Sequence, residues 1–375
     1  MFQFEAMHKG AIIKVVGVGG AGGNAVTNMM QAGIGGVEFI VANTDAQALE
    51  RNEAPNKIHL GKLITKGLGA GGNPEIGQKS AIEDMEFIAD SLKGADIVFV
   101  TAGMGGGTGT GAAPVIASVA KDLGALTVAV VSTPFSWEGR RRNEFAEKGL
   151  NNLRDHVDSY IVVPNDRLLE VVDKNTSLSD GFKLADDVLR QGVQGISDTI
   201  NVPGLINLDC ADVRSIMDSR GLALMGVGSS AGENREREAL EKALKGPLLA
   251  DANIRGAYGI LLNITGGDDL KMYEISNIGS MINEYAGQEA NIYVGAVNDG
   301  RSDGSVKVVL VATGINQQRG TVVLEDFLPK RDANKDTQKQ IIDKARRDLG
   351  QKPAGVEDYN NEDYELPTYL RKQVD

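Results

Sequence analysis

Residues 103–114 read GMGGGTGTGAAP and follow directly on the apolar run ADIVFVTA. Glycine loses more backbone freedom on folding than any other residue, so this density of glycines indicates that the backbone must stay bare. Bare N–H groups at the start of a helix form an anion-binding site, and the hydroxyl groups of Thr108 and Thr110 add donors. We expect the helix to have Pro114 in its first turn and to end near Gly124. The stretch therefore predicts a phosphate-binding loop.

Two more glycine-rich turns lie upstream of this loop. GVGGAGGNAV (17–26) contains the dinucleotide spacing G-x-G-x-x-G, and Asp45 follows the next apolar run, where a ribose hydroxyl would be bound. KGLGAGGNPE occupies residues 66–75. A nicotinamide site needs one pyrophosphate loop, whereas several such loops suit a longer phosphate chain. None of them fits G-x-x-x-x-G-K-[ST], so an ordinary P-loop is excluded.

The order of apolar and helical stretches predicts the fold class. Up to about residue 165, apolar runs alternate with helical segments, which predicts a doubly wound parallel α/β domain with ligands at the carboxyl ends of its strands. Residues 178–200 predict one long central helix, and a second, smaller α/β domain follows, with helices near 233–245 and 271–286. From residue 316 the polar composition predicts a disordered C-terminal tail.

The 375 residues suit two domains and a tail. The runs that predict strands are AIIKVVGVG, VEFIVANT, ADIVFVTAG, LTVAVVSTPF and SYIVVPN in the first domain, and GLALMGVGSS, YGILLNIT, NIYVGAVN and VKVVLVATG in the second. The expected parts are a nucleotide-binding domain, a connecting helix, a second domain, a variable linker and a terminal peptide, over residues 1–176, 177–203, 204–316, 317–363 and 364–375.

Composition limits the partners and the compartment. Lys and Arg number 39 against 51 Asp and Glu, a formal net charge of -12, so we expect no nucleic-acid partner and no general attraction to anionic lipid. Cys210 is the only cysteine, which excludes an internal disulfide and favours a reducing compartment. No run approaches the ~18–20 apolar residues of a membrane helix, so we expect a cytoplasmic protein without direct membrane insertion.

GGGTGTG at 105–111 resembles the signature of the tubulin/FtsZ family, and the similarity extends over residues 10–316. The chain length, the acidic NLDCAD loop and the terminal peptide favour the bacterial cell-division branch over the tubulins. The resemblance implies a GTPase that binds GTP or GDP with Mg²⁺, although it does not identify the metal ligands. It also implies which residues contact the phosphates or lie beside them: Gly20, Ala21, Gly22, Gly23, Asn24, Asn43, Asp45, Gly71, Gly72, Gly106, Gly107, Thr108, Gly109 and Thr110.

The resemblance also implies a sugar and base site. In STPFSWEGRRR, Glu138 would accept hydrogen bonds from the ribose hydroxyls and Arg142 would lie near the base and the sugar, while Asn165 would contact the base. Phe182 and Asp186 are four residues apart on the long helix and therefore share a face, where a ring can stack on guanine and a carboxylate can accept its two adjacent donors. An adenine would leave that carboxylate unsatisfied, at a cost of roughly 1–3 kcal/mol. Asp187 competes with Asp186 for this role.

In GLINLDCADV (204–213), Asn207, Asp209 and Asp212 resemble the family's catalytic loop. Read from the residues alone, Asp209 is a good N-cap and Asp212 lies in the first helical turn. The long helix would carry this loop about 20 Å from a base at Asp186, out of reach of the subunit's own phosphates. The resemblance implies that the carboxylates act on the GTP of a neighbour, in a head-to-tail homopolymer that forms the mid-cell division ring.

YELPTYLRKQ (364–373) resembles the family's C-terminal peptide, which implies binding to membrane tethers and division regulators. The residues expected to make these contacts are Leu366, Pro367, Tyr369, Leu370, Arg371 and Lys372. Two alternatives stay open from the residues alone. An NAD-dependent oxidoreductase would need an acid or base in the second domain, but His8, His59 and His156 all precede it. A nucleotide-sensing scaffold without hydrolysis would keep the glycine loops and lack working carboxylates.

Overall fold

The computed structural model describes residues 10–315 except 174, 203, 219, 250–253, 288 and 301–302, so the predicted linker and terminal peptide lie outside the described residues. The strands are β1 (Ile13–Val18), β2 (Val37–Asn43), β3 (Asn56–His59), β4 (Ile97–Gly103), β5 (Leu126–Thr133), β6 (Ser159–Pro164), β7 (Gly221–Ala231), β8 (Gly259–Gly266), β9 (Asn291–Asn298) and β10 (Ser305–Thr313). Within the described residues they form one sheet in the order β3-β2-β1-β4-β5-β6-β7-β10-β8-β9.

The helices of the first half are α1 (Gly19–Gln31), α2 (Ala46–Arg51), α3 (Lys62–Thr65), α4 (Pro74–Glu83), α5 (Met85–Leu92), α6 (Thr108–Asp122), η1 (Ser136–Glu138), α7 (Arg140–Arg154) and α8 (Asn165–Leu168). Those of the second half are α9 (Leu178–Asn201), α10 (Cys210–Met217), α11 (Arg235–Leu244) and α12 (Met272–Ala286). No helix in the described part of the chain is both long enough and apolar enough to span a membrane.

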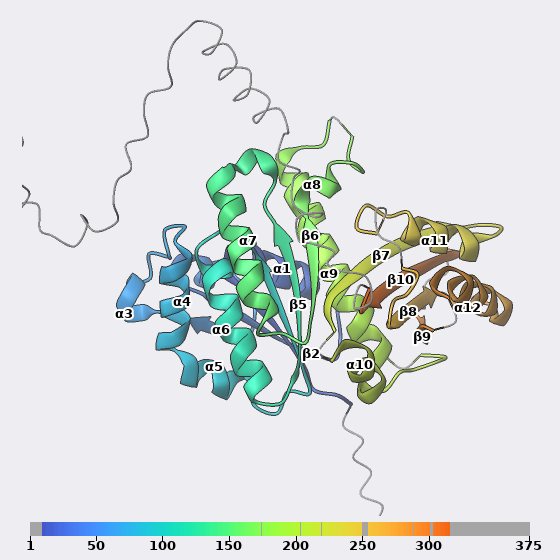
Figure 1. The fold of residues 1–375 in the computed structure, drawn as a ribbon, viewed down its shortest axis with the longest axis horizontal. Coiled ribbons are helices and arrows are strands. Elements are labelled where there is room, and N and C mark those ends of the chain that lie inside the picture. The colour runs from blue at the N-terminus through green and yellow to red at the C-terminus, as the bar shows by residue number, and fades with distance from the viewer. Residues whose placement is uncertain are drawn as a thin grey trace, which may run out of the picture. The chain divides into compact units, whose positions relative to one another are not determined.

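Strands β1 to β6 are parallel, and β1, β4 and β5 are buried almost throughout on both faces, as predicted. Neighbouring residues of β1 enter different cores: Val15 packs in the cluster that contains Met29 of α1 and Leu189 of α9, whereas Val16 packs in the cluster that contains Ile116 of α6. Figure 1 shows α6 and α7 in front of the sheet and α1 behind it. The predicted doubly wound α/β fold is therefore confirmed.

Two local features differ from the prediction. Strand β3 was not expected, because its sequence NKIH buries only Ile58 fully and carries no apolar run. Helix α6 begins at Thr108, so Pro114 lies inside the helix and not in its first turn. Within the helix, Gly111 allows a close approach to α4, because an added Cβ would lie 1.9 Å from the carbonyl oxygen of Pro74. The helix ends at Asp122, two residues before the left-handed Gly124, close to where it was predicted to end.

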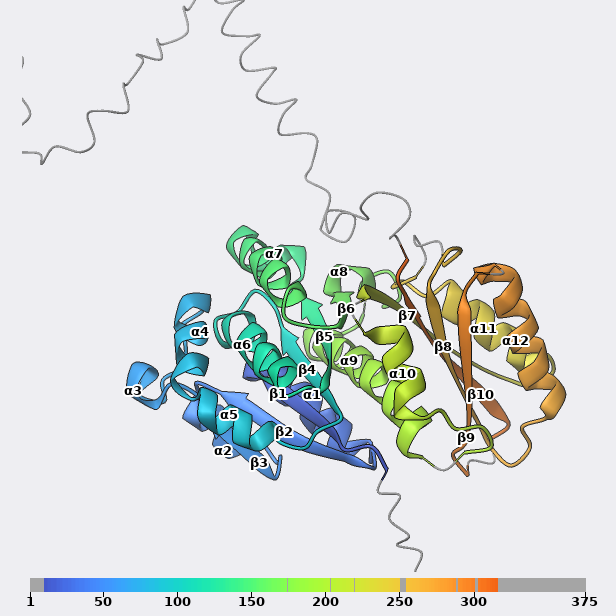
Figure 2. The same cartoon turned by 60° about the horizontal axis from the view of Figure 1, so that its bottom comes forward.

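The second half is α/β, but its sheet is mixed. Strand β10 is antiparallel to β7 and β8, whereas β8 and β9 are parallel. The residues from Ser159 to Ile161 pair with those from Gly221 to Ala223, so β6 joins β7 and the sheet continues from one half into the other. Figure 2 shows α11 and α12 together on one side of this second half. Each half therefore has its own helical cover over a shared sheet.

Helix α9 links the two halves. It has 24 residues, begins at Ser177, whose hydroxyl accepts the N–H of Asp180, and buries one stripe that includes Leu189, Val193 and Ile196. At 1.5 Å per residue its length is about 36 Å. Because the halves share a sheet and this rigid helix, the two ends of α9 are held a fixed distance apart.

Candidate functional site

The three glycine-rich turns meet at the carboxyl ends of β1, β2 and β4. The hydroxyl groups of Thr44 and Thr108 are 2.7 Å apart and share a hydrogen bond. The carbonyl oxygen of Thr44 also accepts the N–H of Gly69 at 3.2 Å, which ties the 66–75 turn to the end of β2. A Cβ added to Gly19 would lie 2.9 Å from the amide nitrogen of Gly109, so the first and third turns are in contact. The predicted convergence of the three turns is therefore observed.

Some glycines of these turns are required by close packing. A Cβ on Gly22 would lie 2.4 Å from the carbonyl oxygen of Thr101, and a Cβ on Gly109 would lie 2.5 Å from that of Gly103. A Cβ on Gly107 would lie 2.9 Å from the amide nitrogen of Asn73. These positions have no room for a side chain because another backbone segment occupies it. They build the shape of the site and need no ligand to explain them.

Other glycines have open space where a side chain would be. No atom lies within 4 Å of a Cβ added to Gly20, Gly106, Gly71 or Gly72. The last two have φ angles of 58° and 73°, which side chains rarely adopt. Ala21 and Asn24, at the start of α1, are also exposed. Around a tightly packed frame, the turns thus leave bare backbone facing outward, as an approaching anion requires.

The other polar residues predicted on the phosphate side have structural contacts. The carboxylate of Asp45 caps α2 by accepting the N–H of Gln47 at 2.9 Å. The side-chain oxygen of the buried Asn43 accepts the N–H of Asp45. The hydroxyl of Thr110 accepts the N–H of Gly105 at 2.8 Å, so it stabilises its own loop. Thr44, which the sequence did not single out, connects two of the turns.

Glu138 and Arg142 lie together at the end of β5. One carboxylate oxygen of Glu138 accepts the N–H of Phe135 at 2.9 Å, and the other pairs with the guanidinium of Arg142. Asp166 accepts the N–H and the hydroxyl of Ser136, which fixes η1 to α8. Asp166 could not be selected from sequence, because its partner lies 30 residues away.

An aromatic cluster lies beside this turn. Phe135 and Trp137 stack with ring centroids 5.3 Å apart, and the ring of Phe182 meets each of them edge to face. Phe135 is buried, whereas Phe182 and Trp137 are partly exposed and can offer a face to a planar ligand. Trp137 was missed, although it lies within the STPFSWEG stretch that drew attention to Glu138.

Asp186 and Asp187 differ sharply in their surroundings. Asp187 forms an ion pair with Arg190 at 2.7 Å on its own helix. Asp186 has no hydrogen-bond partner among the described residues, and burial raises the pKa of its carboxyl group to about 7. Asn165 is buried, and its side-chain oxygen also has no partner within the described part of the chain. Asp186 and Asn165 are thus polar groups that the fold leaves available to a ligand.

The residues predicted to be catalytic lie beyond the other end of α9. The side-chain oxygen of Asn207 accepts the N–H of Gly204 at 2.7 Å. Asp209 and Asp212 form a capping box at the start of α10, each accepting the backbone N–H of the other at 2.8 and 3.2 Å. Each side chain therefore has a local structural role. The three lie in one short loop, well separated from the glycine-rich turns.

Comparisons with known proteins agree with these features. The model of the Tubulin/FtsZ family GTPase domain matches residues 12–173, and that of the FtsZ family C-terminal domain matches residues 221–316. The cell division protein FtsZ of Azotobacter vinelandii is 46% identical and covers 100% of both chains. FtsZ of Pseudomonas aeruginosa is 53% identical over 81% of this chain and 77% of its own. This chain belongs to the FtsZ family.

Solved FtsZ structures match the fold as well. An M. jannaschii FtsZ dimer, at 45% identity, covers 82% of this chain and 89% of its own with a TM-score of 0.78. CetZ2 of Haloferax volcanii, at 21% identity, has a TM-score of 0.71 over 89% of this chain and 99% of its own, and so shows the shared fold alone. As a member of the FtsZ family, the chain is a tubulin-like GTPase that binds guanine nucleotide. The nicotinamide alternative is therefore set aside.

Proposed function

We propose that this FtsZ-family GTPase binds GTP in its glycine-rich turns, assembles head to tail, and hydrolyses the nucleotide between adjacent subunits. The observation that carries the proposal is the separation of two sets of residues. Phe182, near the start of α9, meets Phe135 just after β5, so this end of the helix lies at the carboxyl ends of the strands, where the open glycines and Asp186 are. The loop with Asp209 and Asp212 follows the other end of α9. From Asp186 to Asn201 the helix alone spans about 20 Å. A subunit cannot bring both sets to one phosphate, but two stacked subunits can.

The phosphates would be bound mainly by backbone N–H groups. The open glycines can accept a close approach, and the field at the starts of α1 and α6 favours negative charge. Thr108 would add a hydroxyl from the pair that it forms with Thr44. The residues proposed for the phosphate side are Gly20, Ala21, Gly22, Gly23, Asn24, Asn43, Asp45, Gly71, Gly72, Gly106, Gly107, Thr108, Gly109 and Thr110.

The guanosine would lie between η1 and α9. Phe182 would stack on the base, and Glu138 and Arg142 would contact the sugar. Asp186 would accept hydrogen bonds from the N1–H and the 2-amino group of guanine, because Asp187 is already paired with Arg190. A half-buried carboxylate without a partner among the described residues gains most from such donors, which favours guanine over adenine. The side-chain oxygen of Asn165 also lacks a partner within the described residues, which supports a contact with the base.

Magnesium fits this site through the nucleotide. Among the described residues no group of three or more His, Cys, Asp or Glu side chains could hold a metal alone. Mg²⁺ typically keeps several waters and binds to substrate phosphates with few protein ligands, so such a site needs no protein cage. When bound, the ion neutralises charge that develops on the phosphates. The residues of this chain would orient the phosphate chain and the attacking water.

Hydrolysis would take place when Asp209 and Asp212 of one subunit reach the terminal phosphate of the next. Their carboxylates would orient and polarise the water, and Asn207 would help to position it. The contact joins different surfaces of two identical subunits, so it continues into a filament and does not close. GTP turnover would then require assembly.

Exposed apolar side chains at opposite ends of the described fold support this contact. The surface beside the 66–75 turn, here named the nucleotide face, carries Leu63, which is 82% exposed, and Leu68, which is 84% exposed. A second surface, here named the tail face and distinct from the C-terminal tail, consists of Leu205, Ile206, Met272 and Tyr273, of which Met272 is 88% exposed. Both views show α3 and α12 at opposite ends (Figures 1 and 2). Apolar groups of this size on a monomer surface are typical of an interface, here with a second copy of the chain.

Complementation between two inactive variants tests the proposal. Asp186→Ala should lose guanine binding and keep its carboxylate loop, whereas Asp212→Ala should bind GTP normally and lose turnover. Mixed subunits should recover phosphate release, because the pocket of one meets the loop of the other. Cys210→Ala, which keeps both loop carboxylates, should retain wild-type turnover. A mixture that stays inactive although it assembles with GTP would place catalysis within one subunit and reject the proposal.

We also propose that the filament forms the mid-cell division ring in the cytoplasm and that the terminal peptide binds membrane tethers and division regulators. Support for the ring is the FtsZ family membership, and support for the peptide is its resemblance to the family sequence. Its contacts would come from Leu366, Pro367, Tyr369, Leu370, Arg371 and Lys372, which lie outside the described residues. Deletion of 364–375 should leave GTP hydrolysis intact and abolish capture by a membrane tether.

A further inference from the structure

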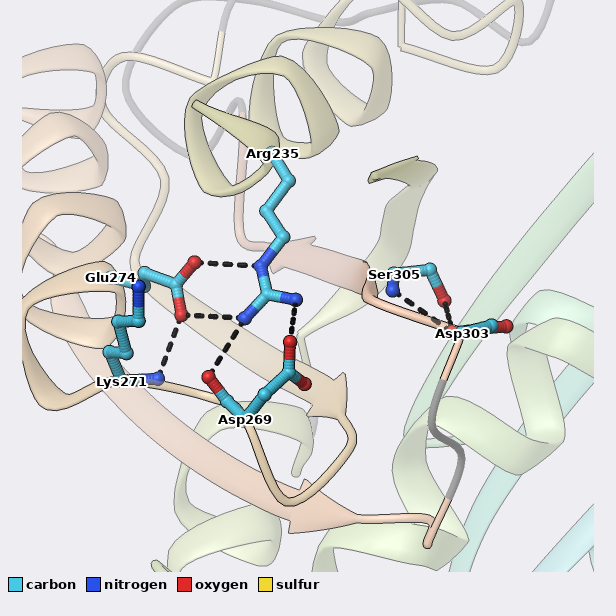
Figure 3. Close-up of polar contacts among 6 residues, drawn as sticks. All are labelled: Arg235, Asp269, Lys271, Glu274, Asp303 and Ser305. Atoms are coloured by element: carbon cyan, nitrogen blue, oxygen red, sulfur yellow. Dashed lines mark hydrogen bonds and ion pairs between the residues drawn. The ribbon is translucent and has the colours of Figure 1, made fainter. Parts of the chain in front are cut away.

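Arg235, the first residue of α11, places a buried guanidinium among three groups (Figure 3). Its Nε donates to one carboxylate oxygen of Glu274 at 2.7 Å, and its Nη2 donates to the other at 3.0 Å. Nη1 pairs with the carboxylate of Asp269, and Nη2 also donates to the carbonyl oxygen of Asp269 at 3.0 Å. One side chain of α11 thus holds residues 269–274, which run into the first turn of α12, at both ends.

The segment that Arg235 holds presents part of the tail face. Lys271, at the N-cap of α12, provides no oxygen to cap the helix, and the buried Glu274 instead accepts its N–H at 2.7 Å. Met272 and Tyr273 lie between the two points that are held, and both are exposed. The backbone that carries them is therefore fixed by the contacts of Asp269 and Glu274 on either side, while the ring of Tyr273 also meets the ammonium group of Lys271 at 5.7 Å.

The same segment is connected to the proposed catalytic loop. The side-chain amide of Asn298 donates to Asp268 at 2.6 Å, which joins the end of β9 to the turn after β8. Two residues earlier on β9, Ala296 accepts the N–H of Leu205 at 2.8 Å and donates to the carbonyl oxygen of Ile206 at 2.9 Å. The turn after β8 and the catalytic loop are therefore anchored to one short stretch of β9.

The ion pair of Arg235 and Glu274 keeps the buried carboxyl group of Glu274 ionised. Burial alone would raise the pKa of Glu274, but hydrogen bonds from Arg235 and from the backbone of Lys271 outweigh it and hold that pKa below its ordinary value. A buried ion pair is seldom more stabilising than an apolar pair of similar size, whereas it fixes direction through its hydrogen bonds. Orientation of the surrounding segment is thus the property that this arrangement supplies best.

We propose that Arg235 is a positioning residue for assembly, which holds the tail face in the geometry that the nucleotide face of the next subunit accepts. This inference rests on the head-to-tail function proposed above and adds the residue that sets one of its two faces. Because Arg235 is buried, it would act through Asp269 and Glu274 and not by direct contact with the neighbouring subunit.

The test is Arg235→Met in the full chain, with three measurements. GTP affinity of the monomer should stay within about twofold, because the nucleotide face is unchanged. The protein concentration needed for GTP-dependent assembly should rise at least about tenfold, as expected for disruption of a central interface contact. Small amounts of the variant should also shorten wild-type filaments, since it can receive a wild-type tail face but offers a defective one. Simple misfolding would not produce such capping.

Arg237→Met is the matched control, because Arg237 lies on the same helix and pairs with Glu241 at the surface. It should assemble as wild type. If Arg235→Met does not fold, Asp269→Asn carries the test, since it keeps the Glu274 pair and should raise the assembly concentration less strongly. If folded Arg235→Met assembled as wild type, the inference about Arg235 would be overturned, while the head-to-tail function would stand. The same holds for Asp269→Asn where that variant is used. Failure of the wild type to assemble with GTP would overturn the head-to-tail function itself.

Discussion

The glycine-rich turns and the carboxylate loop show function in opposite ways. In the turns, Gly20 and Gly106 have open space where a side chain would be, so local packing does not explain them. In the loop, Asn207, Asp209 and Asp212 all form local hydrogen bonds that account for their presence. Packing does not explain the open glycines of the turns, so they point to a ligand. Local hydrogen bonds alone explain the residues of the loop, so their structure does not point to the proposed catalytic role.

If Asp209 and Asp212 act as proposed, a residue that caps a helix is also a catalytic residue. Asp and Asn are nearly equivalent as N-caps, because both offer a side-chain oxygen to the backbone. They are not equivalent for polarising a water, because only the carboxylate carries charge. Substitutions that preserve one property and remove the other can therefore separate the two roles.

The largest effect should come from Asp212→Asn and Asp209→Asn. We expect GTP turnover to fall about 10²–10⁴-fold, the usual contribution of a positioned acid or base. The free energy of unfolding should change by less than about 1 kcal/mol, because the capping box keeps its oxygen acceptors. Turnover by phosphate release and unfolding in urea measure the two quantities. Asp90→Asn, which removes a carboxylate that pairs with Lys93 at the surface, is the control and should change neither appreciably. If turnover and stability fell together, the two carboxylates would have only a structural role as helix caps.

The next effect separates the two kinds of glycine. Gly109→Ala should lower the free energy of unfolding by about 3 kcal/mol, because its Cβ would lie 2.5 Å from the carbonyl oxygen of Gly103. Gly106→Ala meets no neighbouring atom, so stability should be unchanged while GTP affinity falls. Urea unfolding and nucleotide titration measure the pair. If Gly106→Ala bound GTP as wild type, the open glycines would not be phosphate contacts.

The fold could be predicted from the sequence wherever one local pattern was sufficient. The apolar runs gave nine of the ten strands in the described residues, and periodicity gave α9. The missed strand β3 has a single fully buried residue, Ile58, and depends on pairing with β2 for its conformation. The continuity of the sheet through β6 and β7 also could not be predicted, because it joins segments with the whole of α9 between them.

The candidate site was predictable to the same degree. Glycine clustering identified the turns, and helical spacing placed Phe182 and Asp186 on one face. Thr44 and Asp166 were missed because each depends on a partner distant in sequence, at separations of 64 and 30 residues. Which of Asp186 and Asp187 is free for a ligand also required the structure, since the pairing of Asp187 with Arg190 decides it.

A moderate effect should follow the titration of Asp186. Burial raises the pKa of this carboxyl group from 3.8 to about 7, and guanine donors bind its ionised form. At pH 6, one unit below this pKa, only about a tenth of the carboxyl groups are ionised, whereas at pH 8 most of them are. GTP affinity of the monomer should therefore be about tenfold lower at pH 6 than at pH 8. Asp186→Asn should remove this dependence and favour xanthosine triphosphate, because an amide N–H₂ can donate to the 2-oxo group. Asp187→Asn should keep the wild-type pH profile. A flat wild-type profile would contradict the assignment.

The same carboxyl group affects the nucleotide-free fold. Its pKa is higher in the folded than in the unfolded state, so its contribution to stability decreases as pH rises from about 4 to about 7. Asp186→Asn should therefore raise the free energy of unfolding at pH 8 and leave it nearly unchanged below pH 4. Urea unfolding without nucleotide at the two pH values measures the difference. A variant less stable than wild type at pH 8 would mean that Asp186 is satisfied by the protein.

The smallest effect should come from the ion pair at the ribose side. The Arg142 side chain is 55% exposed, so its pair with Glu138 contributes little to stability, about 1 kcal/mol at most. Arg142→Met should therefore reduce GTP affinity only a few-fold and leave unfolding unchanged. Glu138→Leu should be more harmful, because the N–H of Phe135 loses its acceptor and the aromatic cluster loses its fixed position. Nucleotide titration of both variants tests this order. If Arg142→Met lowered GTP affinity more than Glu138→Leu, the charge of the arginine would matter more for binding than the backbone geometry that Glu138 fixes. The glycine-rich side of the molecule would then depend on charged side chains, as the carboxylate loop is proposed to do.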